Sequence, residues 1–468
     1  MHWQPYTPDD RSPWNLRRVA HLHRRAGFAA PWEVLQRDLK DSPQAAVDRL
    51  LAGNEVARTP DDFASLAATI GDAAVASGNV QRLKAWWLYR MMFSPDPLGE
   101  RLTLLWHNHF ATSNRKVQDV AMMRRQNELF RQFARGPFDK LLAAVVKDPA
   151  MLVWLDADSN RREHPNENLA RELMELFTIG VGNYGEDDVK QAARALTGWT
   201  VKNREFREVA AYHDDGEKTI LSRSGKWRGD DLVAMLLEQP ATSVRLARRV
   251  CELLMGEGVV EPAAIDELAA GLREHSGENR GSAPATAQSE RVSGVQWAVE
   301  TVLRSEAFFA ETNIGNRVLA PAEYIVGAVR ALEVFDPPPS TIVLAEWAAA
   351  LGQDLFEPPN VFGWAGGRSW INTRSLIARA NFAQRLAEGA LQSSGAPPDW
   401  PALARRHGCG ENAEDFSRFL AQTLWTGEDG GETKRTEQTI FGEQTALTPE
   451  NARRAVAAML GSPRAQLG

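Results

Sequence analysis

Residues 94–110 read SPDPLGERLTLLWHNHF, and this stretch indicates the fold class of the chain. A Ser-Pro-Asp-Pro turn precedes a run whose apolar residues recur at the 3.6-residue period of one helix face. The face consists of Leu98, Leu102, Leu105, Trp106 and His109. The stretch therefore predicts an amphipathic helix that starts next to the turn.

The same helical period recurs along most of the chain. It predicts helices over 117–134, 138–146, 232–255, 263–274, 295–309, 320–334 and 375–388. A last helix begins at Thr448, which is followed by Pro449 and Glu450, a typical helix start. The best strand signal lies at about 199–222, where β-forming residues flank the Asp214-Asp215-Gly216 turn. We expect a mainly α, multi-helix globular body with one small β-hairpin and long loops.

The chain shows neither strand–helix alternation nor a glycine-rich phosphate motif, which argues against Rossmann and P-loop folds. Residues 276–293 are rich in Gly, Ser, Ala, Gln and charge, so they predict a flexible loop. That loop separates an N-terminal helical region, 1–275, from a C-terminal helical region, 294–468. We expect the two regions to pack as one body.

Composition excludes several classes of protein. The 468 residues are 43% hydrophobic and 25% charged, as in an ordinary globular protein, and the net charge of −7 argues against a nucleic-acid partner. No apolar run is long enough for a membrane span or a signal peptide, so a cytoplasmic location is the default expectation. Cys251 and Cys409 alone indicate neither a disulfide framework nor a zinc ribbon.

The densest polar stretch is 164–177, HPNENLARELMELF. On a helix its polar residues fill one stripe and its apolar residues the other, and the stripe has two interpretations. It could face water, with i,i+4 ion pairs on either side of Arg171. It could instead face a cleft, where Glu167, Glu172 and Glu175 hold a divalent metal or act as acid and base.

His107 and His109 flank Asn108 in the Trp106–Phe110 segment. Imidazole is a common ligand for transition metals, and two histidines at i,i+2 can bind one ion if the helix ends between them. If the helix continues, the two rings point almost opposite ways. His109 then lies on the apolar stripe and His107 faces outward, so each is a single core or surface histidine.

Two loops complete the candidate set. His213 begins the Asp214–Gly216 turn, from which it could reach a shared metal, although acids and glycine also suit any β-turn. Residues 358–370, PPNVFGWAGGRSW, contain Trp364, Arg368 and Trp370. Aromatic rings and permissive glycines suit a wall against a sugar or planar ligand, but tryptophan also anchors long loops to a core.

These segments resemble the bacterial family catalogued as domain of unknown function 1800. The matching pieces are 21–28, 106–110, 147–152, 165–172, 175–177, 193–199, 213–218, 352–353 and 358–364. The resemblance places the candidate histidines, glutamates and Arg171 at motif positions, whereas His164 departs from the pattern. It implies no settled activity. Family members often look secreted and tend to be encoded beside a partner resembling alkaline phosphatases or sulfatases, so the resemblance implies periplasmic export with a partner as an alternative location.

Taken together, the sequence favours a metal-dependent hydrolase acting on a small molecule or carbohydrate, with a divalent metal ion as cofactor. The candidate ligands are His107, His109, Glu167 and Glu172; the candidate catalytic residues are Glu175, as general base, and Arg171, as anion anchor; the candidate substrate contacts are His213, Trp364, Arg368 and Trp370. One alternative is a non-catalytic helical binding or assembly partner, whose Glu/Asn/Arg network is a structural lock. A metal-free carbohydrate-binding protein is another.

Overall fold

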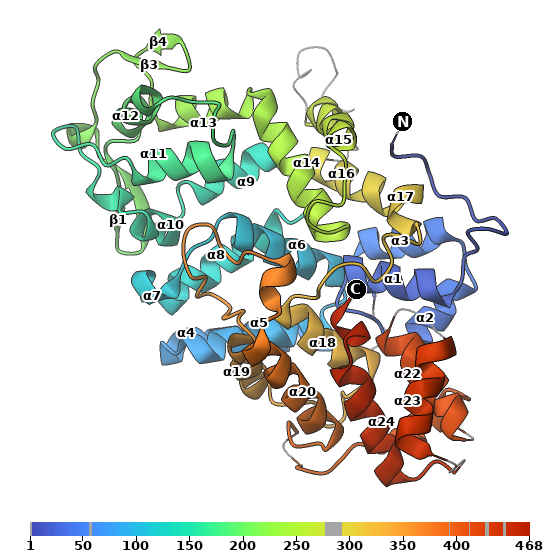
Figure 1. Ribbon diagram of the computed structural model, residues 1–468. Helices are drawn as coiled ribbons and strands as arrows, with labels where there is room; N and C mark the ends of the chain where they lie inside the picture. Colours follow the sequence, from blue (N-terminus) through green and yellow to red (C-terminus); the bar gives the residue numbers. More distant parts are fainter. Residues whose placement is uncertain are drawn as a thin grey trace.

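A computed structural model describes residues 2–55, 59–276, 293–392, 394–410, 412–425, 430–442 and 446–468. Helices dominate these ranges, and the only strands within them are four short ones in two separate two-stranded sheets (Figure 1). The predicted mainly α fold is confirmed. The predicted loop at 276–293 lies almost entirely outside the described residues. No helix within the described ranges has the length and apolar character needed to cross a membrane.

The N-terminal helices surround residues 94–110. The helix of this stretch, α6, spans Pro97–His109, and the Asp96 side chain caps it by accepting a hydrogen bond from the Gly99 N–H. The other helices of this region are α1 (Leu16–Ala26), α2 (Trp32–Leu39), α3 (Pro43–Ala52), α4 (Phe63–Ser77), α5 (Val80–Phe93), α7 (Asn114–Val117), α8 (Val120–Gln132), α9 (Phe138–Val145) and α10 (Pro149–Trp154).

The predicted helix over 164–177 is shorter and less regular than its sequence pattern suggests. It consists of α11 (Asn168–Glu172), followed by a π-helical turn over Leu173–Phe177. Wide turns of this kind often occur at functional sites. The predicted helix over 232–255 is two helices, because Pro240 has no N–H to continue the first one. The elements that follow are α12 (Glu186–Ala195), α13 (Gly229–Leu237), α14 (Pro240–Leu254) and α15 (Pro262–His275).

The C-terminal half is helical as well. Thr448 caps the last helix by accepting a hydrogen bond from the Asn451 N–H, as its sequence predicts. The helices are α16 (Gly294–Leu303), α17 (Glu306–Phe309), α18 (Pro321–Ala331), α19 (Thr341–Ala350), α20 (Thr373–Ala387), α21 (Trp400–Arg406), α22 (Ala413–Leu424), α23 (Gly430–Phe441) and α24 (Pro449–Gly461).

The small β element differs in detail from the expected single hairpin. Strands β1 (Trp199–Lys202) and β2 (Glu205–Glu208) pair antiparallel, and so do β3 (Lys218–Ile220) and β4 (Arg223–Gly225). Both two-residue connections have positive φ at each residue, which is the turn that suits the twist of a hairpin. The Asp214–Gly216 segment connects the two hairpins instead of turning within one.

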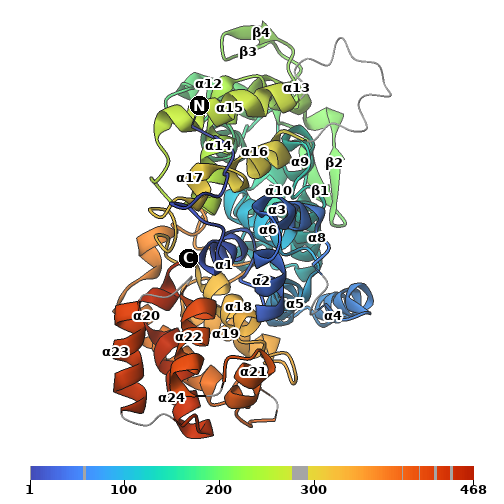
Figure 2. The same cartoon turned by 90° about the vertical axis from the view of Figure 1, so that its right-hand side faces the viewer.

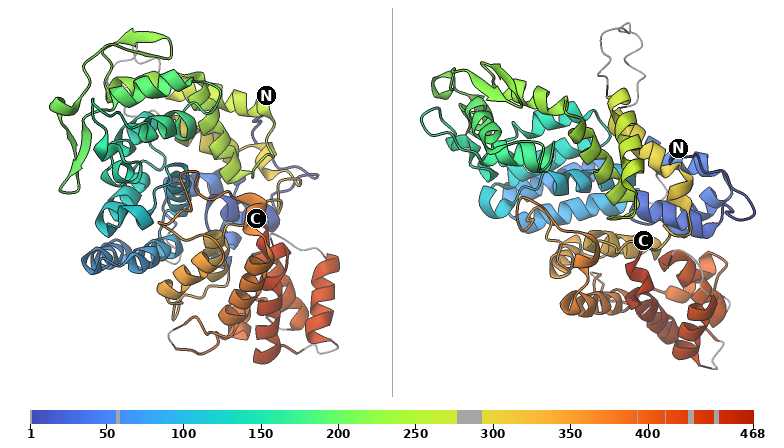
Figure 3. Two further views of the ribbon diagram at one scale, coloured as in Figure 1. Left: turned by 60° about the vertical axis from the view of Figure 1, so that its left-hand side comes forward. Right: turned by 45° about the horizontal axis from the view of Figure 1, so that its top comes forward.

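Two clusters of buried apolar side chains form the interior. The first combines residues from α1, α2, α4 and α5 with residues from α18 to α24, whereas the second is drawn from residues 6–309. Figures 2 and 3 show the corresponding arrangement, with the orange and red helices gathered at one end and the green helices at the other. Helix α6 contributes to both clusters, Leu104 to the first and Leu105 to the second. Polar side chains on α6 are therefore held between two packed cores.

Candidate functional site

His107 is buried near the end of α6, among aromatic rings. Its Nε2 accepts a hydrogen bond from the Phe356 N–H at 3.2 Å, and its ring lies against Trp87 and Trp364 at centroid distances of 5.2 and 5.6 Å. Burial lowers the pKa of His107 to about 3, so the ring is neutral. His107 therefore holds the connection between α19 and α20, drawn in orange in Figure 1.

His109 is buried too, but it contacts a different element. Its Nε2 donates to the Phe177 carbonyl at 3.2 Å, at the end of the π-helical turn. Burial, with the nearby positive charges of Arg249 and Arg245, holds the pKa of His109 well below its usual value. The helix continues through both histidines, so each Nε2 is used by the backbone of a separate segment.

Asn108, between the two histidines, fastens the tryptophan loop. Its Oδ1 accepts from the Trp364 N–H at 2.7 Å, and its Nδ2 donates to the Trp364 carbonyl at 3.3 Å. The loop meets Asn108 at Gly363, where an added Cβ would clash with both Asn108 oxygens. The Trp106–Phe110 segment thus positions two distant parts of the chain.

The first half of the predicted carboxylate stripe is close to solvent. Arg171 pairs with Glu167 at 3.0 Å and with Glu186 of α12 at 2.8 Å, and the exposed fractions of these three side chains are 32%, 38% and 68%. The side-chain hydrogen bonds that Arg171 donates to Glu186 raise the pKa of Arg171. This part of the stripe fits the water-facing interpretation.

The second half of the stripe is partly buried. Tyr184 donates its hydroxyl to Glu175 Oε2 at 2.8 Å. Burial and the neighbouring charge of Glu175 raise the pKa of Glu172. Glu175 lies within electrostatic reach of Arg245 on α14, the helix that also carries Arg249. These two carboxylates therefore belong to a different environment from Glu167.

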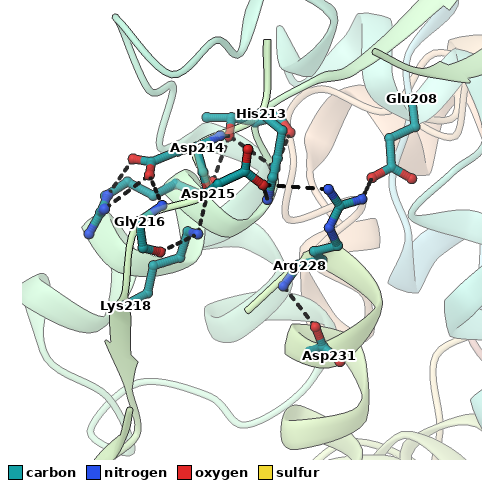
Figure 4. A network of polar contacts seen from close by, with 10 residues as sticks. Glu208, His213, Asp214, Asp215, Gly216, Lys218, Arg228 and Asp231 are labelled. Carbon is teal, nitrogen blue, oxygen red and sulfur yellow. Dashed lines mark hydrogen bonds and ion pairs between the residues drawn. The ribbon is translucent and has the colours of Figure 1, made fainter. Parts of the chain in front are cut away.

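His213 is buried in the connection between the two hairpins (Figure 4). Its Nδ1 donates to the Thr197 carbonyl at 2.9 Å, and Arg194 holds the neighbouring Asp214 at 2.7 Å. Asp214 Oδ1 also accepts from the Gly216 N–H at 2.8 Å. These contacts hold the connection between the two hairpins in one conformation, and the polar groups of His213 and Asp214 are used within the chain.

The structure does not bring the four predicted metal ligands together. His107 and His109 bond to different backbone segments, Glu167 is paired with Arg171, and Glu172 lies near Glu175. In the described part of the chain, no group of three or more His, Cys, Asp or Glu residues is placed to hold a metal ion. The four predicted ligands therefore lie in separate environments and do not converge on one point.

A cleft of about 290 Å³ lies beside α6 instead. Trp364 and Trp370, which pack with Ala320, form one part of its wall, and residues of α6 and α14 form other parts. The lining residues are Arg101, Leu104, Leu105, Asn108, Arg249, Glu252, Leu253, Glu257, Arg317, Ala320, Glu323, Gln353, Phe362, Trp364, Ala365, Gly366 and Trp370. Trp364 and Trp370 thus line a cleft, whereas Arg368 is exposed and lies outside this lining.

The floor of the cleft is a buried cluster of charges. Glu323 of α18 forms ion pairs with Arg101 of α6 and, at 2.7 Å, with Arg317, and its Oε2 accepts from the Ala320 N–H at 2.8 Å. Burial raises the pKa of Glu323, but the two arginines offset this effect and hold it at about 2. The carboxylate is therefore ionised, and it is shared by two guanidinium groups.

The rim of the cleft is more accessible to water. Arg249 and Glu252 pair at 3.1 Å on α14, and Phe362 is 65% exposed. Glu257 lies against the backbone of Gly366, whose φ is +73° and whose Cβ, if present, would come within 2.6 Å of the carboxylate. A glycine is required at this position for both reasons.

Sequence reasoning missed the charged residues of this cleft. Arg101 is more than 200 residues from Arg317 and Glu323 in the sequence, and none of the three lies in a dense polar motif. One signal was available for Arg101. It lies one turn from Leu98 and Leu105 on the otherwise apolar face of α6, and Asn108 follows two turns later. A charged residue on such a face is buried only when it has a partner.

Comparison with known proteins gives a family and no activity. A family described as "Protein of unknown function (DUF1800)" matches residues 21–467. No curated protein and no solved structure matches the chain. The matched range includes α6, α14, α18 and the tryptophan loop, so it contains every residue that lines the cleft. The chain therefore belongs to the DUF1800 family of proteins of unknown function.

Proposed function

We propose that this protein binds a small organic anion with a single negative charge in the cleft beside α6. The charges around the cleft support this proposal. Among the described residues, Arg25, Arg101, Arg249 and Arg317 lie in or directly behind the lining, with Glu252, Glu257 and Glu323 as their acidic neighbours. The lining itself carries three arginines and three glutamates, so its charges balance. Arg25, an electrostatic neighbour of Arg101 and Arg317 outside the lining, adds the one positive charge that an anion would neutralise.

The unpaired polar atoms at the floor are the observation that carries the proposal. Arg101 Nη2 and Arg317 Nε are buried without a hydrogen-bond partner in the described ranges. Gln353 uses its Oε1 to accept from the Ala322 N–H at 2.9 Å, while its Nε2 makes no hydrogen bond to the described part of the chain. All three groups are donors. A ligand group that only accepts hydrogen bonds, such as a carboxylate, suits a lining whose unpaired groups are donors.

The size and the walls of the cleft restrict the rest of the ligand. A volume of about 290 Å³ lies just below the usual range for small-molecule sites, roughly 300–1,000 Å³. The faces of Trp364 and Trp370 suit a flat or cyclic body. We therefore propose a small carboxylic acid that carries one ring, either aromatic or a sugar ring.

This proposal develops the binding and carbohydrate alternatives of the sequence analysis. The metal-dependent hydrolase required His107, His109, Glu167 and Glu172 around one ion, and these side chains serve separate contacts. We therefore propose binding without assigning a metal or a reaction.

Isothermal titration calorimetry on the full chain tests the proposal. The panel consists of benzoate and glucuronate, with benzamide and glucose as neutral analogues. We expect the carboxylates to bind at least tenfold more tightly than their neutral analogues, a difference of about 1.4 kcal/mol. Equal affinities, or no binding of either carboxylate at millimolar concentration, would overturn it.

Substitutions of two arginines, Arg317 and Arg368, provide a test variant and its matched control. Arg317→Met removes a floor guanidinium but leaves Glu323 paired with Arg101, so the variant retains a buried ion pair. We expect it to lose at least tenfold in affinity for carboxylates. Arg368→Met, on the exposed surface of the same loop region, should bind as the wild-type protein does. Equal effects of the two substitutions would contradict the location of the site.

A further inference from the structure

The connection between α19 and α20, which contains the tryptophan loop (residues 358–370), is fixed to α6 at two adjacent residues of that helix. Asn108 binds both the N–H and the carbonyl of Trp364, and His107 accepts from the N–H of Phe356. Both anchored loop residues are therefore held by neighbouring positions on one rigid helix. The Trp364 ring also lies against the His107 ring, with centroids 5.6 Å apart.

The loop backbone is shaped for this attachment. Phe356 has a φ of +62° and Gly363 a φ of +75°, both in the left-handed region that few residues adopt without strain. Gly363 also needs to lack a Cβ, because the Asn108 carbonyl oxygen would lie 2.6 Å from it. A backbone in this conformation persists only where surrounding contacts determine it.

Asn108 itself is at the wall of the cleft. It lines the cavity together with Trp364, and its two amide atoms form a pair of hydrogen bonds to one residue. Such a pair fixes orientation as well as distance, because the planar amide meets the N–H and the carbonyl at once. By holding the backbone of Trp364, Asn108 therefore also orients its indole ring.

We infer that Asn108 is a positioning residue that determines specificity for the ring of the ligand. It holds Trp364 where the indole forms a wall with Trp370 and Ala320. The floor arginines bind the anionic group independently of this wall, since they are attached to α6 and the segment before α18. This inference rests on the proposed anion-binding function, and it assigns selectivity to a residue that does not bind the anion itself.

The test compares two anions that differ in the ring. Benzoate and acetate share the carboxylate, and only benzoate reaches the tryptophan wall. In Asn108→Ala we expect benzoate affinity to fall about tenfold while acetate affinity stays within twofold of wild type. Gly363→Ala should give the same split, because it displaces the loop from the opposite side of the contact. Equal losses for both anions, or no loss for either, would overturn the inference.

Hydrogen–deuterium exchange provides a readout that does not depend on any ligand. Asn108→Ala should speed amide exchange in residues 357–366, because the Trp364 N–H loses its acceptor. His109→Ala is the matched control, since His109 is on the same helix but bonds to Phe177. It should speed exchange near Phe177 and leave residues 357–366 unchanged. If residues 357–366 exchange equally fast in the wild type and in Asn108→Ala, Asn108 does not position the loop.

The two measurements separate the possible failures. If neither benzoate nor acetate binds the wild-type protein, the proposed function is wrong and the specificity assigned to Asn108 is wrong with it, whatever the exchange shows. If both bind and Asn108→Ala leaves their affinity ratio unchanged, only the inference about Asn108 is wrong.

Discussion

His107 Nε2 accepts a hydrogen bond from the Phe356 N–H, although 249 residues separate the two positions in the sequence. His109, two residues further along α6, uses its Nε2 as a donor to the Phe177 carbonyl. The two rings therefore carry their protons on different nitrogens, since each is set by its own backbone partner. A motif that resembles a pair of metal ligands is, in this fold, a pair of neutral backbone anchors.

The buried neutral state of His107 predicts a pH dependence of stability. Its pKa is about 3 in the folded protein and near 6.5 when unfolded, so the unfolded chain binds the proton first as pH falls. This contribution is fully present above about pH 6.5 and is lost progressively below it. The glutamine of His107→Gln cannot be protonated and keeps an acceptor. The variant should therefore lose less free energy of unfolding than the wild type as pH falls, by on the order of 1 kcal/mol per pH unit. Urea unfolding of both proteins between pH 7.5 and pH 5 measures this pH dependence of the free energy of unfolding. The exposed His164→Gln is the control, and a wild-type slope in His107→Gln would contradict the prediction.

Gly363→Ala should be strongly destabilising because the new methyl group meets the Asn108 oxygens in a left-handed backbone conformation. We expect a loss of about 3 kcal/mol or more in the free energy of unfolding. Gly78→Ala isolates the backbone contribution, since Gly78 has a φ of +62° with open space around it. That variant should lose only about 1–2 kcal/mol. Equal losses in denaturant titrations would exclude a role for the contact with Asn108.

Glu323→Gln should expose the charge imbalance at the floor of the cleft. The substitution leaves Arg101 and Arg317 buried without their shared carboxylate, so we expect a loss of about 3–5 kcal/mol. Saturating benzoate should recover part of that loss by supplying the missing negative charge, and it should raise the unfolding temperature more than in the wild type. Glu257→Gln, at the exposed rim, is the control with a small expected effect. A benzoate shift no larger than that of the wild type would argue against an anion at the floor.

Glu167→Ala should leave the protein close to wild type in stability and in carboxylate affinity. Glu167 is partly exposed, and Arg171 keeps its pair with Glu186 when it is removed. Thermal unfolding and the benzoate titration measure both quantities. Elemental analysis of the two proteins adds a direct check on the sequence hypothesis. A stoichiometric metal present in the wild type and lost from folded Glu167→Ala would restore Glu167 as a ligand.

The fold could be predicted from local patterns because helix formation is largely a local property. The period of Leu98, Leu102 and Leu105 and the cap at Asp96 determine α6 without reference to the rest of the chain. The same holds for Thr448 at the start of α24. The π-helical turn over Leu173–Phe177 could not be read in this way, since its last carbonyl is bonded by His109 from another helix.

The sequence by itself determined that the chain is helical, and it identified the Trp106–Phe110 segment and the tryptophan loop as candidates for a site. Only the tertiary structure decided which polar groups meet. It separates His107, His109 and Glu167 and joins Arg101, Arg317 and Glu323. The physical reason is that a helix fixes the direction of a side chain, whereas the partner of a buried charge is set by the packing of segments hundreds of residues apart.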